Sequence, residues 1–207
     1  VDVSSDGKVG LGTLSGLLGA LTVDGQGGSD TLNISDLGDA VAGSGRLSST
    51  SFTGFGTAGI GYAGFEALNL QLGQGADALD IVSTYLQAVT TIRAGPGSDT
   101  INVSSDLGLL SDIDGHLVVD GQTGTTDTLN VSDTGDATGQ SGTLTSTDIT
   151  GLGTAGITYS NLEQLNITLG SGNDTFAVQS TLPATTLDTG NGIDTVTVSG
   201  PTQLLSD

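Results

Sequence analysis

The sequence predicts an all-β fold: a parallel β-solenoid, of β-helix or β-roll type, whose corners are Gly-Asp loops. Three observations support this prediction, namely alternating apolar residues, Gly-rich loops that end in Asp, and a long internal repeat. The composition agrees with it, because 35 of the 207 residues are Gly and only 3% are aromatic. Stacked coils of small residues need fewer large side chains than a conventional core, and Gly permits sharp corners.

The long repeat has a period of 96 to 97 residues. Residues 23–26 recur at 119–122, and residues 47–66 align without gaps on 144–163 with 12 of 20 positions identical. We therefore interpret the whole chain, residues 1–207, as a single solenoid. The predicted division is repeat 1 at about 1–100, repeat 2 at about 101–200, and the start of a further repeat at 201–207.

A shorter unit, Gly-x-Gly-x-Asp, lies within each long repeat. The segment after each loop alternates, with apolar residues two and four positions after the Asp, as Leu79 and Ile81 follow Asp77. Alternation with a period of two predicts strands that bury one face. The loops that keep the motif end at Asp77, Asp99, Asp174 and Asp194, and two looser copies end at Asp30 and Asp127.

The spacing of these loops predicts coils of unequal length. The gaps that follow the loops at Gly25 and Gly121 are long enough for two coils each, with middle corners at residues 54–57 and 151–154. A β-sandwich would also show short strands and turns. We favour the solenoid because loops and strands keep a fixed phase, which stacking explains. An α-helical fold is incompatible with the Gly content and the period.

The loop aspartates predict calcium binding. Calcium prefers six to eight oxygen ligands from carboxylates and carbonyls, and a Gly-rich turn exposes carbonyls beside an Asp at a fixed offset. Asp and Gly also make good turns without a metal, so the prediction depends on six loops in one phase, whose stacked carboxylates would repel one another without cations. Loops on adjacent coils would share an ion, and the expected pairs are Asp77 with Asp99, Asp99 with Asp127, and Asp174 with Asp194. Asp30 is expected to be weaker, because its next corner, at residues 54–57, carries no carboxylate.

Two kinds of segment carry a resemblance to known proteins. Residues 73–81 and 190–198 resemble the nonapeptide of RTX β-roll proteins, Gly-Gly-x-Gly-x-Asp followed by x-hydrophobic-x. Residues 156–176 resemble repeats of giant secreted bacterial surface proteins. This resemblance implies a β-helix or β-roll, export from the cell, and Ca²⁺ held by the loop Asp residues. The spacing departs from the family, whose nonapeptides follow in direct tandem, because these loops lie 20 to 49 residues apart. The loop at Gly121 also lacks the second glycine in register.

Charge and composition exclude several classes of function. With 23 acidic and 3 basic residues the formal net charge is −20, which argues against binding nucleic acid or an anionic membrane. No stretch of 18 apolar residues predicts a transmembrane helix, and the absence of Cys excludes disulfides and thiolate metal sites. The single His116 and scattered basic residues lack the paired base and nucleophile of a catalytic site, so no enzyme activity is predicted.

We therefore expect an extracellular or cell-surface structural segment, such as a spacer, a fibre or an adhesin stalk, stabilised by calcium and by contact with further copies of the repeat. One alternative is a flat ice- or carbohydrate-binding face, formed by outward Thr-x-Asn pairs such as Thr100 with Asn102 and Thr128 with Asn130. Asn33, Asn102 and Asn130 are also expected to form a ladder of amides. A second alternative is a filament of copies joined end to end, because open sheet edges are templates for strand addition.

Overall fold

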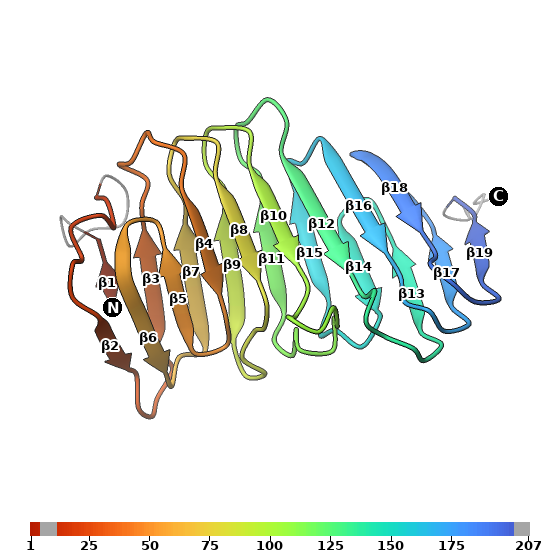
Figure 1. The fold of residues 1–207 in the computed structure, drawn as a ribbon, viewed down its shortest axis with the longest axis horizontal. Coiled ribbons are helices and arrows are strands. Elements are labelled where there is room, and N and C mark those ends of the chain that lie inside the picture. Colours follow the sequence, from red (N-terminus) through yellow and green to blue (C-terminus); the bar gives the residue numbers. More distant parts are fainter. Residues whose placement is uncertain (5–11, 201–207) are drawn as a thin grey trace, which may run out of the picture.

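The computed structural model describes residues 1–4 and 12–200, and the regular elements in those ranges are all β-strands. They form a 10-stranded sheet, here called sheet A, and a 9-stranded sheet, called sheet B, whose strands succeed one another along the long axis of the molecule (Figure 1). In spatial order, sheet A consists of β1 (Asp2–Val3), β3 (Thr31–Ser35), β7 (Ala67–Gln71), β9 (Val89–Arg93), β11 (Leu117–Asp120), β15 (Ile157–Ser160), β14 (Asp148–Gly151), β13 (Ser141–Leu144), β17 (Thr175–Val178) and β19 (Thr195–Val198). Sheet B consists of β18 (Ala184–Asp188), β16 (Gln164–Thr168), β12 (Thr128–Ser132), β10 (Thr100–Val103), β8 (Ala78–Ile81), β4 (Ser44–Leu47), β5 (Ser51–Gly54), β6 (Thr57–Ala63) and β2 (Leu21–Asp24).

Most consecutive strands alternate between the two sheets. Thus β7, β9 and β11 are adjacent parallel strands of sheet A, and β8, β10 and β12 are adjacent parallel strands of sheet B. The apolar residues of adjacent strands align in buried rows, such as Ile34, Leu70, Ile92 and Val119. Rows from both sheets join one hydrophobic cluster. The prediction of an all-β fold with parallel, one-face-buried strands is therefore confirmed.

Each long gap between Gly-Asp loops contains a three-stranded antiparallel meander within one sheet, β4–β5–β6 in sheet B and β13–β14–β15 in sheet A. The prediction of two coils with a middle corner in each gap is wrong. Residues 54–56 and 151–153 are hairpin turns in which every residue has a positive φ, between 51° and 98°. Glycines on both sides of the turn adopt that conformation at little cost, so the chain reverses within one sheet and does not cross to the other.

Repeated tyrosines hold these meanders together. The phenol of Tyr159 donates a hydrogen bond of 2.5 Å to the carbonyl of Thr145, and Tyr62 donates in the same way to the carbonyl of Ser48. Both rings are buried. Their recurrence in the sequence therefore reflects a shared structural role in the meander.

Equivalent strands of the two long repeats lie on opposite sheets. Strands β3, β7 and β9 of the first repeat belong to sheet A, whereas their counterparts β12, β16 and β18 belong to sheet B. The cause is the number of times that the chain crosses between the sheets in one repeat. From β2 in sheet B to its counterpart β11 in sheet A this number is odd, so every strand of the second repeat lies on the sheet opposite to that of its counterpart. The six acidic loops therefore do not form the single column that the sequence suggests, because equivalent loops fall on opposite edges.

Outward asparagines form two hydrogen-bonded ladders, one on each sheet. The Nδ2 of each Asn donates to the Oδ1 of the residue on the adjacent strand. The order from donor to acceptor is Asn166, Asn130, Asn102 and Asp80 on sheet B at 2.8 to 2.9 Å, and Asn69, Asn33 and Asp2 on sheet A at 2.7 Å. The expected ladder is confirmed for Asn102 with Asn130, whereas Asn33 belongs to the other sheet.

Candidate metal centre: the acidic loops

The loops that connect the sheets lie at two opposite edges of the molecule (Figure 1). The fully described loops that run from sheet A to sheet B precede β4, β8, β10, β12, β16 and β18, and we call their position the A-to-B edge. Loops that run from sheet B to sheet A form the B-to-A edge. The predicted site residues divide into Asp77, Asp99 and Asp127 at the A-to-B edge, and Asp30, Asp174 and Asp194 at the B-to-A edge.

Acidic residues at the A-to-B edge form a continuous hydrogen-bonded column. The main-chain N–H of Asp77 donates to Oδ1 of Asp99 at 2.7 Å, and the N–H of Asp99 donates to Oδ1 of Asp127 at 2.9 Å. Glu163 continues the column, because its Oε2 accepts the N–H of Asp127 at 2.7 Å. Asp77 with Asp99, and Asp99 with Asp127, are thus neighbours, as the sequence predicted.

The B-to-A edge carries two shorter columns of the same construction. The N–H of Asp174 donates to Oδ1 of Asp194 at 2.9 Å, which confirms that these two residues are neighbours. The N–H of Asp30 donates to Oε2 of Glu66 at 2.7 Å. Asp30 therefore does have a carboxylate in the next loop, and the contrary prediction is wrong because it took the hairpin turn at residues 54–57 for a corner.

The glycines of the motif let these loops stack closely. A Cβ added to Gly97 would lie 2.2 Å from the carbonyl oxygen of Gly75 and 2.9 Å from Oδ1 of Asp99. A Cβ added to Gly192 would lie 1.9 Å from the carbonyl oxygen of Gly172 and 3.1 Å from Oδ1 of Asp194. At both positions a main-chain carbonyl oxygen of one loop and a carboxylate oxygen of the next therefore lie close to the Cα of the glycine, where a side chain would otherwise stand.

Several loop carboxylates are buried without a full set of hydrogen bonds. Asp99, Asp127 and Asp174 are 1 to 2% exposed, and the Oδ2 atom of each has no hydrogen-bond partner among the described residues. Burial disfavours the charged form. Together with the negative charges of Asp127 and Asp77, burial raises the pKa of Asp99 to about 7, against the opposing effect of the N–H donated by Asp77. Burial also raises the pKa values of Asp77 and Asp127.

Asp36 and Asp133 are buried carboxylates that the loop motif does not identify. They are repeat counterparts, and their Oδ1 atoms accept the N–H groups of Leu14 at 2.6 Å and Leu110 at 2.8 Å. Burial, reinforced by neighbouring aspartates, raises the pKa of each to about 6. Asp133 also leaves its Oδ2 without a partner in the described part of the chain. The only sequence signal is the repeated Asn-x-Ser-Asp segment, which predicts a strand end and gives no sign of a buried charge.

The donor set fits calcium if main-chain carbonyls supply most of the ligands. Among residues 1–4 and 12–200, no group of three or more His, Cys, Asp or Glu side chains is placed to hold a metal ion. The carbonyl and carboxylate oxygens at Gly97 and Gly192, and the unpartnered Oδ2 atoms, are the hard oxygen donors that calcium prefers. The residues that would hold an ion at the A-to-B edge are Asp99 and Asp127, with carbonyls of the loops on either side.

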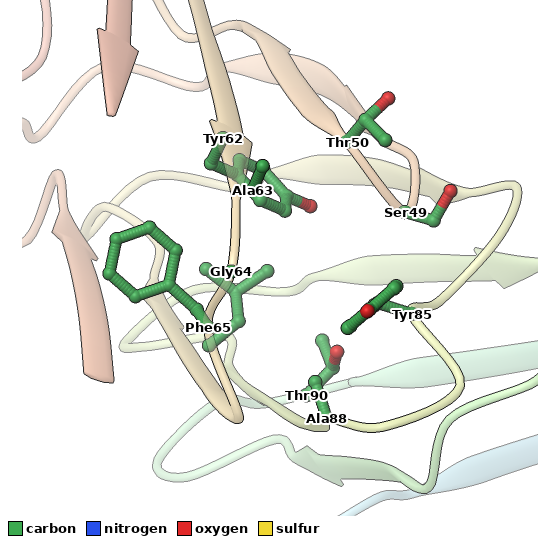
Figure 2. A pocket seen from close by; sticks show the side chains of 10 residues that line it. Ser49, Thr50, Tyr62, Ala63, Gly64, Phe65, Tyr85, Ala88 and Thr90 are labelled. Atoms are coloured by element: carbon green, nitrogen blue, oxygen red, sulfur yellow. The ribbon is translucent and has the colours of Figure 1, made fainter. Parts of the chain in front are cut away.

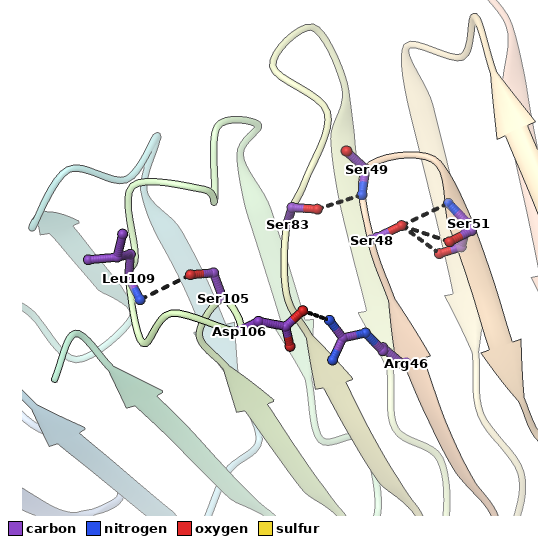
Figure 3. Close-up of polar contacts among 8 residues, drawn as sticks. All are labelled: Arg46, Ser48, Ser49, Ser51, Ser83, Ser105, Asp106 and Leu109. Carbon is purple, nitrogen blue, oxygen red and sulfur yellow. Dashed lines mark hydrogen bonds and ion pairs between the residues drawn. The ribbon is translucent and has the colours of Figure 1, made fainter. Parts of the chain in front are cut away.

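Two surface features lie away from these columns. Arg46 of β4 forms an ion pair with Asp106 in the loop before β11 (Figure 3). Both side chains are exposed, so solvent screens the pair and it contributes little to stability. A small apolar pocket is lined by Tyr62, Phe65, Tyr85 and neighbouring small residues (Figure 2). Its lining contains no His, Lys, Asp or Glu, and so it offers no general base at neutral pH.

The single histidine lies in a polar cluster on the surface of sheet A. Nε2 of His116 is 3.2 Å from Oγ1 of Thr158, and this hydroxyl donates a hydrogen bond of 2.8 Å to Oδ1 of Asp148. Because the single hydroxyl hydrogen of Thr158 is used in the bond to Asp148, the imidazole of His116 donates to Oγ1 of Thr158. The cluster therefore lacks the order of groups in which a histidine activates a nucleophile.

Comparisons with known proteins add no assignment. The chain matches no model of a protein family, and searches of curated proteins and of solved structures found no significant match. In the described part of the chain, no helix has the length and apolar character needed to cross a membrane. A functional proposal therefore depends on the geometry of the acidic loops.

Proposed function

We propose that this chain is a structural, non-catalytic segment of an extracellular or cell-surface protein. In this proposal it is a flattened β-solenoid of the RTX-like β-roll type, used as a spacer, fibre or stalk, whose acidic corners bind calcium. Alternation of strands between two sheets and the stacking of Gly-x-Gly-x-Asp loops support the solenoid. The observation that carries the calcium proposal is the column through Asp77, Asp99 and Asp127, where buried carboxylate oxygens lack partners.

The charge balance of the folded chain favours a bound cation. A buried carboxylate without a counter-charge destabilises the folded state, and carboxylates in one column repel one another. The formal charge of −20, with only 3 basic residues, adds repulsion across the whole molecule. Calcium would neutralise the loop carboxylates and use their free oxygens as ligands. A proton is the competing means of neutralisation.

Weak sites are sufficient for this role outside a cell. Extracellular modules bind calcium with dissociation constants of roughly 10⁻⁴ to 10⁻³ M. Binding to the folded state alone stabilises it by about 1.4 kcal/mol per site when calcium exceeds the dissociation constant tenfold. In the cytosol, where free calcium is far lower, the same chain would be easier to unfold for export.

Thermal unfolding followed by circular dichroism tests the proposal. We expect a melting temperature several degrees higher in millimolar calcium than in chelator, with a smaller effect of magnesium. The double variant Asp99→Asn/Asp127→Asn should lose most of this increase. Asp114→Asn changes an exposed acid outside the columns and should keep the increase. Identical melting in calcium and in chelator would reject calcium and leave the strand architecture unaffected.

The outward faces give less support to ice or carbohydrate binding. Thr100 and Thr128 lie side by side on sheet B, but Ala78 and Gln164 flank them, which ends the row of threonines. The outward asparagines also use their amide groups to bind one another. This alternative stays a prediction, and thermal hysteresis of the calcium-loaded protein is the measurement that tests it.

A further inference from the structure

We propose that the end of the molecule formed by β18 and β19 binds the end formed by β2 and β3 of a second copy, with β19 of one copy replacing β1 of the next. This inference builds on the proposed structural role and names the surfaces and the register through which copies join. Among the described strands, nothing pairs with the outer edges of β18, β19 and β2. The two ends are far apart on one molecule (Figure 1), so they can meet only between copies.

At the β19 end, apolar residues are exposed that are buried elsewhere in the repeat. Val196 and Val198 are 43% and 77% exposed, whereas their counterparts in β10, Ile101 and Val103, are each 1% exposed. The difference is one neighbouring strand, because β10 lies between β8 and β12 whereas β19 pairs with β17 alone. An added strand would therefore bury an apolar surface that the sequence already provides.

The β2 end shows the same deficit. Leu21 and Val23 are only partly buried, whereas their counterparts in β11, Leu117 and Val119, are completely buried. Strand β11 has β9 on one side and β15 on the other, but β2 has only β6, the counterpart of β15. The missing neighbour of β2 is therefore a strand equivalent to β9.

The structure contains the template for this junction in sheet B. Strand β18 is the repeat counterpart of β9, and β2 is the counterpart of β11. Inside the molecule β9 and β11 are parallel neighbours, with Thr91 opposite Val118. The same register between two copies sets Thr186 opposite Thr22. Each strand then receives the kind of partner that its counterpart already has.

Sheet A provides the second half of the junction. Strand β10 pairs with β12, with Asn102 opposite Asn130, and the equivalent pair between copies is Thr197 of β19 with Asn33 of β3. Within one copy, β3 pairs instead with β1, which sets Asp2 opposite Asn33. Strand β1 spans 2 residues and β19 spans 4. If β18 pairs with β2 of the next copy in sheet B, then β19 can pair with β3 of that copy in sheet A only if it takes the place of β1.

One residue pair in this register opposes association. Inside the molecule Arg93 of β9 lies opposite Asp120 of β11, whereas the junction would set Asp188 opposite Asp24. Like charges on directly opposite residues of neighbouring strands are destabilising. Association is therefore expected to strengthen with ionic strength or divalent cations, and Asp188 is the position that controls its strength.

Cysteine cross-linking of the full chain tests the register, because the natural sequence contains no Cys. Thr22→Cys/Thr186→Cys should form disulfide-linked oligomers on mild oxidation, since facing residues of adjacent strands lie within reach of a disulfide. Thr22→Cys/Thr147→Cys places the second thiol at an exposed site away from both ends and should cross-link several-fold less. Equal cross-linking of the two variants would overturn the proposed register.

Sedimentation equilibrium tests the surfaces and the strand replacement. Asp188→Arg, which restores the charge pair found inside the molecule, should lower the dissociation constant about 3- to 10-fold. Val196→Asp/Val198→Asp should abolish association, and Leu107→Asp, at an exposed site elsewhere, should leave it unchanged. Val3→Ser weakens β1 and should promote association. Unchanged or weaker association of this last variant would overturn the replacement of β1.

Running these experiments in calcium and in chelator separates the junction from the calcium sites. Cross-linking that persists in chelator, together with melting that does not depend on calcium, would support the junction and reject the calcium sites. Calcium-dependent melting of a chain that stays monomeric and does not cross-link would overturn the junction alone.

Discussion

The main-chain N–H of Asp99 donates a hydrogen bond of 2.9 Å to Oδ1 of Asp127, which follows it by 28 positions in the chain. The carboxylate of Asp127 thereby satisfies the backbone of the neighbouring loop, a structural use of Asp that needs no metal. Its Oδ2 is buried and has no partner within residues 1–4 and 12–200. One oxygen thus holds the loops together, while the other is the oxygen that the calcium proposal assigns to the cation, and substitutions can test the two roles separately.

Asp99→Asn should stabilise the protein in the presence of chelator. The amide keeps an Oδ1 acceptor for the N–H of Asp77 and removes a buried charge, whose pKa is raised to about 7. We expect the free energy of unfolding at pH 8 to increase by on the order of 2 kcal/mol, measured by urea denaturation. Asp114→Asn should change it by less than about 0.5 kcal/mol. A clear loss of stability in Asp99→Asn would contradict the buried-charge interpretation.

Stability in chelator should increase from neutral to mildly acidic pH. Asp99, with a pKa of about 7, and Asp36 and Asp133, each at about 6, bind protons when folded at pH values where unfolded Asp, at about 3.9, has lost them. The free energy of unfolding therefore rises as the pH falls from 8 towards 4, and this gain is lost as the pH rises through the folded-state pKa values. Asp136 and Asp148, whose pKa values are lowered by hydrogen bonds from threonine side chains, act in the opposite direction below about pH 4. Melting temperatures across this range check the prediction, and a maximum at neutral pH would be inconsistent with it.

Gly97→Ala should destabilise the stacked loops. The new Cβ would lie 2.2 Å from the carbonyl oxygen of Gly75, and φ of Gly97 is 155°. Relief of the clash requires that neighbouring loops separate, so we expect a loss of about 2 to 4 kcal/mol. In Gly27→Ala the added Cβ would meet nothing within 4 Å, and a change below about 1 kcal/mol is expected. Calorimetric melting compares the two, and equal effects would argue against close stacking.

Substitutions at two positions of the amide ladder on sheet B should cause losses of stability that differ with the number of hydrogen bonds removed. Asn130 both donates to Asn102 and accepts from Asn166, at 2.8 and 2.9 Å. Asn130→Ala therefore removes both hydrogen bonds, whereas Asn166→Ala removes the bond to Asn130. At about 1 kcal/mol per bond, the first variant should lose roughly twice the stability of the second in urea denaturation. Equal losses would mean that the ladder contributes little beyond packing.

The sequence predicted the elements whose signal is local. Alternation after Asp77 identified β8, and the fixed offset of each Asp from its glycines identified the neighbours in the A-to-B column. The hairpin at residues 54–56 escaped prediction because its Gly-x-Gly sequence is also that of a corner. Whether such a turn reverses within a sheet or crosses to the other depends on the strand against which it packs, and a local pattern contains no such information.

By itself the sequence determined the strands that follow the Gly-Asp loops, which face of each of these strands is apolar, and which loops are acidic, because these depend on side-chain type and short spacing. Only the tertiary structure decided that the acidic loops divide between two edges, that Glu66 and Glu163 complete their columns, and that Asp36 and Asp133 are buried. The physical reason is that each outcome depends on how many times the chain crosses between the sheets, and on contacts between residues 22 to 36 positions apart.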